Sequence, residues 1–216
     1  MKISADALLF DSDETLVSTL RSVVRTWTRW AADYGLTLED LKRVEVHGRP
    51  AAAIVADLLP PELVADAVAR LEDAEVADAM SGGVLPVPGA AELLAALPPD
   101  RWAVVTSGTR RVAEARLAQV GIAPRCLITV GDITRHKPHP EPFLLAAERL
   151  GVDPSRCVVF EDAPAGLTAG RAAGMTTVAL TTTHPAADLD ADVVVADLTA
   201  VSVRTTEGGL EVVAGA

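Results

Sequence analysis

The sequence predicts an α/β protein: a doubly wound (Rossmann-like) parallel sheet with a small α-helical cap inserted into it. Short, continuous apolar runs predict the sheet, because strands that are buried on both faces do not alternate polar and apolar residues. Helical stretches that end at a glycine separate most of these runs, as the crossovers between parallel strands require. Residues 17–82 show helical patterns and no strand pattern, which predicts the cap.

Six apolar runs are the expected strands, and the segments between them carry the apolar spacing of helices. The strands are expected at residues 7–10, 102–106, 126–129, 157–160, 176–180 and 192–195. The helices of the core are expected at residues 88–97, 110–120, 141–150 and 164–173. Near the C-terminus, two apolar segments flank Glu207, Gly208 and Gly209, a pattern typical of a β-hairpin.

The inserted segment is expected to form a helical domain of its own. Its helices are predicted at residues 18–34, 38–44, 51–59 and 62–80. In the first of them, Leu20, Val23, Trp27 and Trp30 form one apolar stripe, as in a helix that packs against neighbours. We therefore expect a catalytic core at residues 1–16 and 83–216 and a cap at residues 17–82.

Composition and charge narrow the class of partner. The formal net charge is −11, which disfavours nucleic acid and anionic lipid because both bind through Lys and Arg patches. No apolar run reaches the roughly 20 residues that span a membrane. Cys126 and Cys157 lack CxxC spacing and lead into apolar runs, so two buried thiols are expected. We expect a cytoplasmic protein, a monomer or weak homodimer, that acts on a small phosphorylated metabolite.

Two carboxylates follow the first expected strand. Asp11 and Asp13 come where the carboxyl end of a strand faces the ligand crevice of an α/β sheet. Asp11 can attack phosphorus as a covalent nucleophile, and Asp13 can protonate the leaving oxygen and later deprotonate water. A pair of this kind also occurs in loops that only cap a helix. Residues at the other strand ends are therefore needed to distinguish a catalytic pair from a helix cap.

Polar residues at two further strand ends favour a site for phosphate and metal. The hydroxyl and backbone N–H groups of Thr106 and Ser107, close to a helix start, can hold phosphate oxygens. Glu161 and Asp162 can join Asp11 as oxygen ligands of Mg²⁺. Either segment alone is also a plausible helix cap.

Lys137 follows the third expected strand and is one of only three lysines, since arginine dominates the basic residues. Its compact ammonium can bridge a phosphate and an aspartate. Three close carboxylates repel one another without a cation, so the cluster also requires a divalent metal. Four weak signals at four strand ends together predict phosphoryl-transfer chemistry.

These segments together resemble the motifs of the haloacid dehalogenase superfamily of phosphatases. The resemblance lies in residues 10–17, 105–109, 137–140 and 160–166, in this order along the chain. It is strongest to the β-phosphoglucomutase-like branch with a small helical cap, and there to sugar phosphatases of the 2-deoxyglucose-6-phosphate and glycerol-phosphate type. The resemblance implies a Mg²⁺-dependent hydrolase of small sugar or polyol phosphates.

The resemblance also implies individual roles. The implied ligands of Mg²⁺ are Asp11, Asp162 and the backbone carbonyl of Asp13, with Glu161 in support or acting through water. The implied phosphate-binding residues are Thr106, Ser107 and Lys137. The cap loop that carries Gly48 and Arg49 would face the site and recognise the substrate beyond its phosphate, although a plain surface loop is the alternative.

One position departs from the family pattern, because Glu14 stands where the family usually has glycine. Glycine tolerates backbone angles that glutamate resists, and we expect the Glu14 side chain to point away from the site. Two alternative interpretations use the same residues: a phosphoglucomutase-type isomerase and a non-catalytic phosphate-binding relative. The sequence identifies neither the physiological substrate nor the pathway.

Overall fold

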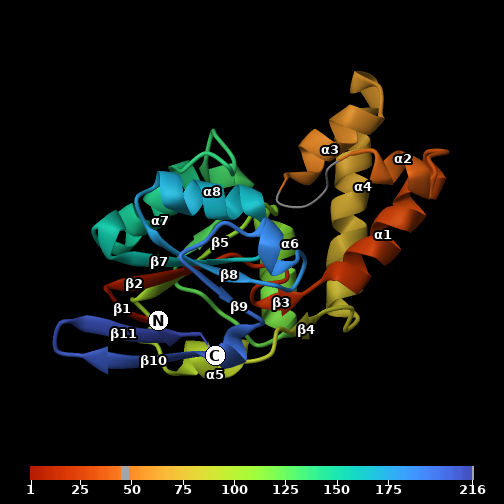
Figure 1. Ribbon diagram of the computed structural model, residues 1–216. Coiled ribbons are helices and arrows are strands. Elements are labelled where there is room, and N and C mark those ends of the chain that lie inside the picture. The colour runs from red at the N-terminus through yellow and green to blue at the C-terminus, as the bar shows by residue number, and fades with distance from the viewer. Residues whose placement is uncertain (45–48, 216) are drawn as a thin grey trace.

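The computed structural model describes residues 1–44 and 49–215 (Figure 1). At its centre lies a six-stranded sheet with the order β6-β5-β2-β7-β8-β9, in which all neighbouring strands are parallel. The strands are β2 (Ala7–Phe10), β5 (Trp102–Val105), β6 (Leu127–Ile128), β7 (Cys157–Glu161), β8 (Thr176–Leu180) and β9 (Val193–Val195). The predicted fold class is confirmed, and each of the six predicted strands is present.

Helices cover both faces of this sheet. They are α5 (Ala90–Ala95), α6 (Arg110–Gln119), α7 (Glu141–Leu150) and α8 (Pro164–Ala172). Along β2, Leu8 and Phe10 belong to the apolar cluster that includes α5 and α6, whereas Ala7 and Leu9 belong to the cluster that includes α7 and α8. Because successive side chains point to opposite faces and both faces are covered, the strand is apolar throughout.

A second, three-stranded antiparallel sheet has the order β1-β11-β10. Its strands are β1 (Lys2–Ala5), β10 (Val201–Thr206) and β11 (Gly209–Ala214). The predicted C-terminal hairpin is confirmed in β10 and β11, whereas β1 was not predicted from the sequence. This strand pairs Lys2 with Val213, and the two termini therefore lie side by side (Figure 1).

Residues between β2 and β4 (Leu85–Pro86) form a helical segment. Its helices are α1 (Leu20–Asp33), α2 (Leu38–Lys42), α3 (Ala51–Leu58) and α4 (Pro61–Met80). They share an apolar cluster that contains Trp27, Trp30 and Leu71. Where the chain enters and leaves this segment, β3 (Val17–Ser18) pairs with β4. This helical segment corresponds to the expected cap, and the exact division at residues 17–82 stays a prediction.

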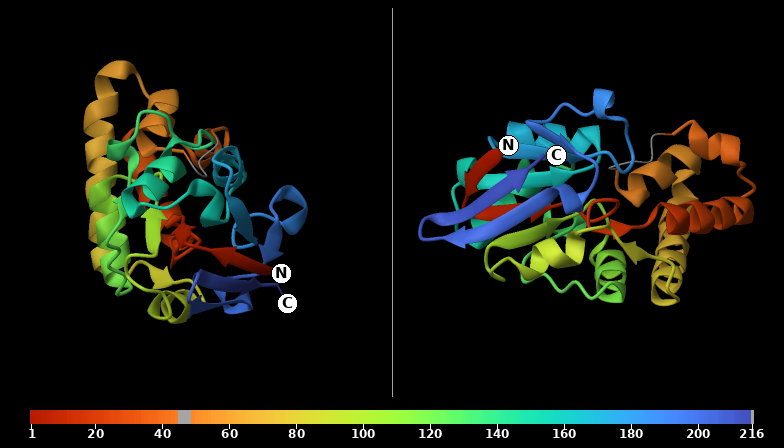
Figure 2. Two further views of the ribbon diagram at one scale, coloured as in Figure 1. Left: turned by 90° about the vertical axis from the view of Figure 1, so that its left-hand side faces the viewer. Right: turned by 60° about the horizontal axis from the view of Figure 1, so that its bottom comes forward.

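Helix α4 packs against α6 of the core (Figure 2). On this contact, the Thr109 hydroxyl donates to a Glu72 carboxylate oxygen at 2.7 Å. Arg111 and Asp73 form an exposed ion pair with an N···O distance of 2.6 Å. The cap is therefore attached to the core by the packing of α4 on α6 as well as by its two chain connections.

Gly89 allows a test of how α5 packs on the C-terminal segment. Its φ is +83°, and a Cβ there would lie 2.4 Å from the carbonyl carbon of Leu198. Gly121 has a similar φ of +75° but open space around its Cβ position. Alanine at either position introduces left-handed strain of about 1–2 kcal/mol, and the clash at Gly89 adds about 1–3 kcal/mol.

We therefore expect Gly89→Ala to lower the free energy of unfolding by at least about 1 kcal/mol more than Gly121→Ala. Urea denaturation of the two variants measures the difference. Equal losses would contradict the close approach of Gly89 to Leu198.

Candidate active site

The residues of the predicted site come from the carboxyl ends of neighbouring strands. Asp11 directly follows β2, Thr106 directly follows β5, and Glu161 is the last residue of β7, with Asp162 next to it. Because β5, β2 and β7 are adjacent and parallel, these ends lie at one edge of the sheet. Lys137 reaches the same place from the loop that follows β6.

The ammonium of Lys137 lies between the acids. Its Nζ donates to Asp11 Oδ1 at 2.6 Å, to Glu161 Oε1 at 2.6 Å and to the Val105 carbonyl at 2.9 Å. These bonds use all three donors of an ammonium group. Burial by itself lowers the pKa of Lys137, but the carboxylates of Asp11 and Glu161 outweigh it and hold this pKa above its usual value. The lysine therefore remains a fixed positive charge.

Both carboxylate oxygens of Glu161 have partners. Oε1 accepts from Lys137, and Oε2 accepts from the backbone N–H groups of Asp162 and Ala163, each at 3.1 Å. A Cβ on Gly166 would lie 1.7 Å from Glu161 Oε1, so the glycine leaves room for this carboxylate. Glu161 thus fixes both Lys137 and the loop that carries Asp162.

Three acids of this site form a group that suits a divalent cation. Asp11, Glu161 and Asp162 each offer a carboxylate oxygen, and these oxygens lie within 4.8 Å of one another. Burial raises the pKa of Asp11 well above its ordinary value. Burial also raises the pKa of Asp162 to about 7, and the Glu161 carboxylate adds to the rise. A cation with hard oxygen ligands would relieve this excess of buried negative charge, so the donor set fits Mg²⁺.

Thr183 holds Asp162 and was not identified from the sequence. Its hydroxyl lies 2.6 Å from Asp162 Oδ2, and His184 Nδ1 lies 3.2 Å from the backbone carbonyl of Asp162. The available signal was the run Thr181, Thr182 and Thr183 directly after β8, a further strand end at the same edge of the sheet. Polar residues there orient the carboxylate rather than add another acid.

Thr106 and Ser107 lie in the loop that leads into α6. Thr106 is buried, and its hydroxyl oxygen accepts from the backbone N–H of Gly108 at 3.0 Å. Ser107 is partly exposed. Thr109 caps α6 by accepting from the backbone N–H of Val112 at 3.4 Å. The loop thus places hydroxyl groups at a helix N-terminus, an environment that favours anions.

The carboxylate of Asp13 does not belong to the acidic group found among the described residues. Instead, its Oδ1 accepts from Arg116 Nη1 at 2.8 Å. Arg116 was not identified from the sequence, because nothing in its helix distinguishes it from the other arginines of the chain. The fold brings it to a carboxylate that is 103 residues away along the chain.

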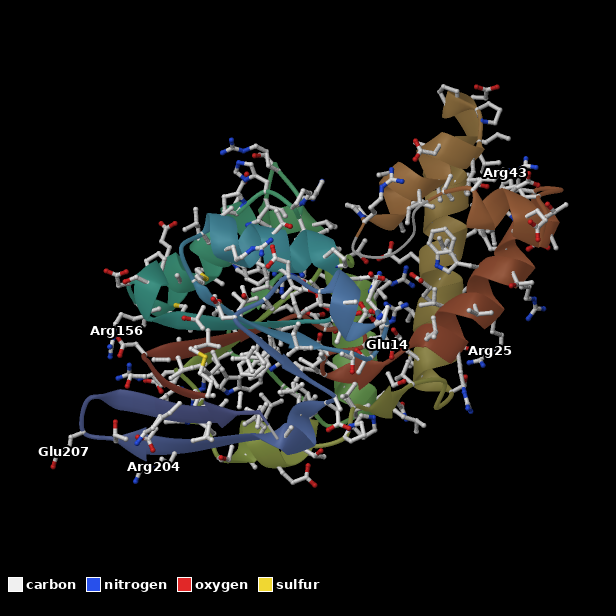
Figure 3. All side chains as sticks on the ribbon, in the orientation of Figure 1. Glu14, Arg25, Arg43, Arg156, Arg204 and Glu207 are labelled. Atoms are coloured by element: carbon white, nitrogen blue, oxygen red, sulfur yellow. The ribbon has the colours of Figure 1, made fainter. Side chains whose placement is uncertain are left out.

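Glu14 adopts a φ of +60° and is the only non-glycine residue with positive φ in the described part of the chain. Its Oε1 accepts from the backbone N–H groups of Thr19 at 2.5 Å and Leu20 at 2.6 Å. Figure 3 shows Glu14 where the core meets α1. The carboxylate therefore caps α1, whose own N-cap residue Thr19 makes no side-chain cap. This is why glutamate is accommodated where the family usually has glycine.

The cap residues expected to recognise substrate are described only in part. Gly48 lies outside the described residues. Arg49 donates from Nη2 to Asp57 Oδ2 of α3 at 2.8 Å, so it has an acidic partner within the cap. A role of Arg49 or Gly48 in specificity stays a prediction.

Residues 5–174 match the family of haloacid dehalogenase-like hydrolases. The chain belongs to this family. The match contains all four motif segments, from the strand before Asp11 to the helix after Asp162.

Several relatives of this hydrolase are phosphatases. Hexitol phosphatase A of Escherichia coli (strain K12) is 40% identical over 181 residues, which cover 80% of this chain and 81% of the relative. The 2-deoxyglucose-6-phosphate phosphatase 1 of Saccharomyces cerevisiae (strain ATCC 204508 / S288c) is 35% identical over an alignment of 236 residues, which covers 97% of this chain and 95% of the relative. The prediction of a phosphatase with sugar-phosphatase relatives is confirmed.

Solved structures also match this hydrolase. The β-phosphoglucomutase of Clostridium difficile superposes with a TM-score of 0.74 and 23% identity, covering 90% of this chain and 92% of that one. At this identity, the likeness concerns the fold alone. It agrees with the predicted parallel sheet and inserted helices.

Glu14 can be tested with two substitutions that separate backbone strain from helix capping. Glu14→Ala keeps the left-handed strain and loses the cap, so the free energy of unfolding should fall by about 1 kcal/mol. Glu14→Gly also loses the cap but relieves the strain, so it should be about 1 kcal/mol more stable than Glu14→Ala. Chemical denaturation of both variants measures these differences.

The result would contradict the capping role if Glu14→Ala were as stable as the native chain. Turnover of Glu14→Gly provides the second check. An increase by orders of magnitude would mean that glutamate impairs the native site, contrary to its observed place at the start of α1.

Proposed function

We propose that this hydrolase is a Mg²⁺-dependent phosphatase that hydrolyses small sugar or polyol phosphates through a phospho-aspartate at Asp11. The observation that carries the proposal is the buried Asp11 carboxylate, held at 2.6 Å by Lys137 beside Glu161 and Asp162. The phosphatases that act on hexitol phosphates and 2-deoxyglucose 6-phosphate support this substrate class.

In the first step, a carboxylate oxygen of Asp11 attacks phosphorus while the bond from phosphorus to the alcohol oxygen breaks. Asp13 donates a proton to the departing alcohol. Thr106 and Ser107 hold the phosphate oxygens, and Lys137, whose three N–H donors are engaged, attracts these oxygens through its positive charge. Because one carboxylate oxygen of Asp11 accepts a hydrogen bond from Lys137, the other oxygen is oriented for attack.

In the second step, water attacks the phosphorus of the phospho-aspartate, and the bond from phosphorus to the Asp11 oxygen breaks. Asp13 takes the proton from this water and thereby returns to its protonated form. Inorganic phosphate is released, and Asp11 is again a carboxylate. The same Asp13 therefore acts as an acid in one step and as a base in the other.

The proposed metal site uses Asp11, Asp162 and the backbone carbonyl of Asp13, with Glu161 in support or acting through water. Mg²⁺ there supplies positive charge that offsets repulsion between the carboxylate nucleophile and the phosphate. Thr183 orients Asp162 for this role, and Lys137 orients Asp11.

Substrate selection is assigned to the cap, residues 17–82, through the loop with Gly48 and Arg49. The partner is a small phosphorylated metabolite, and the protein is a monomer or weak homodimer of the cytoplasm without nucleic-acid or membrane partners. In the part of the chain that the structure describes, every helix is too short or too polar to cross a bilayer.

Asp11→Asn tests the nucleophile. The amide is almost the same size but cannot form the phospho-aspartate, so phosphate release from 2-deoxyglucose 6-phosphate should be abolished. The fold should persist, because burial already disfavours the charged form of this side chain. Asp188→Asn, at an exposed position in a short 3-10 helix, is the matched control and should retain full turnover. Phosphate release that persists in Asp11→Asn would contradict the assignment.

Removal of metal tests the proposed cofactor. Dialysis against a chelator should abolish phosphate release, and added Mg²⁺ should restore it. Mg²⁺ at about 100 times its dissociation constant should also raise the free energy of unfolding by about 2.7 kcal/mol. Asp162→Asn should weaken this stabilisation, whereas Asp188→Asn should not. An active, chelator-resistant enzyme would contradict the proposal.

A further inference from the structure

Arg116 is a buried cation with no part in the chemistry described so far. It lies on α6 and is 5% exposed. Its Nη1 donates to Asp13 Oδ1 at 2.8 Å, and its Nη2 donates to Glu75 Oε1 of the cap helix α4 at 3.0 Å. One guanidinium thus joins the core, the loop after Asp11 and the cap.

The surroundings hold Arg116 in place. Its neighbours on α6, Ala113 and Leu117, are packed into the main core, which fixes the helix that carries it. On the other side, Glu75 Oε1 also accepts from Trp27 Nε1 of α1 at 3.1 Å. The planar guanidinium has a rigid arrangement of donors, so fixing Nη2 on Glu75 also fixes the direction of Nη1 toward Asp13.

Stability alone does not explain this arrangement. Burying charges costs desolvation free energy, and buried ion pairs are often no more stabilising than apolar residues of similar size. In addition, Arg116 Nε is buried without a hydrogen-bond partner, which is unfavourable. The Asp13 side chain, in contrast to that of Arg116, is 32% exposed. A carboxylate held by Arg116 therefore remains accessible to a substrate.

We propose that Arg116 is a positioning residue that fixes the Asp13 carboxylate for proton transfer and, through Glu75, ties this position to the cap. The inference rests on the proposed role of Asp13 as general acid and base. It adds that the proton-transfer group is aligned by a side chain of the core helix α6, which the cap helices α4 and α1 hold from the other side.

The test uses two substrates with different leaving groups. A sugar alcohol leaves poorly and needs a proton from Asp13, whereas p-nitrophenolate leaves readily without one. The ratio of kcat/KM for 2-deoxyglucose 6-phosphate to that for p-nitrophenyl phosphate therefore reports proton donation. A merely structural residue would change both values alike.

Arg116→Met in the native chain would leave the buried Glu75 carboxylate without its cation, which endangers folding. We therefore compare Glu75→Gln with the double variant Glu75→Gln/Arg116→Met. A misplaced catalytic group costs about 100-fold in rate, so the double variant should lower the substrate ratio by about 10- to 100-fold relative to Glu75→Gln. Arg116→Lys keeps the positive charge but loses the planar guanidinium that contacts Asp13 and Glu75 at once. It should lower the ratio in the same direction but less.

Arg111→Gln is the matched control, because it removes an exposed pair between α6 and α4 that does not touch Asp13. Its substrate ratio should equal that of the native chain. Asp13→Asn separates the proposed role of Asp13 from that of Arg116. If this substitution lowers kcat/KM for both substrates equally, the assignment of Asp13 as the acid fails, and the role of Arg116 fails with it. If Asp13→Asn lowers the ratio while the double variant and Arg116→Lys leave it unchanged, only the inference about Arg116 is overturned.

Discussion

Lys137 contacts Asp11, Glu161 and the Val105 carbonyl at once, so a single buried ammonium joins the ends of strands β2, β7 and β5. Removal of this charge would leave two buried carboxylates without their cation, a strongly destabilising arrangement. The same contact explains why Gly166 must lack a side chain, since the Glu161 carboxylate occupies that space to reach Lys137. The orientation of the Asp11 carboxylate and the packing of α8 are thus consequences of one ion-pair network.

Asp13 and Glu14, in the loop that contains Asp11, link this loop to the cap. Asp13 contacts Arg116, which in turn contacts Glu75 of α4, while Glu14 caps the first helix of the cap. Left-handed strain at Glu14 is offset by two hydrogen bonds to otherwise unpaired N–H groups. Within four positions, the chain therefore carries the proposed nucleophile Asp11, the proposed proton-transfer group Asp13 and a connection to the helices of the cap.

Features encoded locally were predictable from the sequence. The buried strands are continuous apolar runs in the sequence. The acids that follow these runs were expected to lie close together, because parallel strands present their carboxyl ends at one edge of the sheet. Features that depend on contacts between distant segments were missed. Strand β1 is four residues long and forms only because β11 lies beside it, and Arg116 acquires meaning only where α6 passes Asp13. Thr183 was missed because hydroxyl groups after a strand are common in ordinary turns.

The sequence by itself determined the α/β class, the order of the motifs and the identity of Asp11, Lys137, Glu161 and Asp162 as one site, because strand and motif patterns are short-range signals. Tertiary structure decided what each charge is paired with. It directed Lys137 to two acids, Asp13 to Arg116 and Glu14 to the start of α1. Pairing of buried charges depends on distances between segments up to 126 residues apart, which no local pattern records.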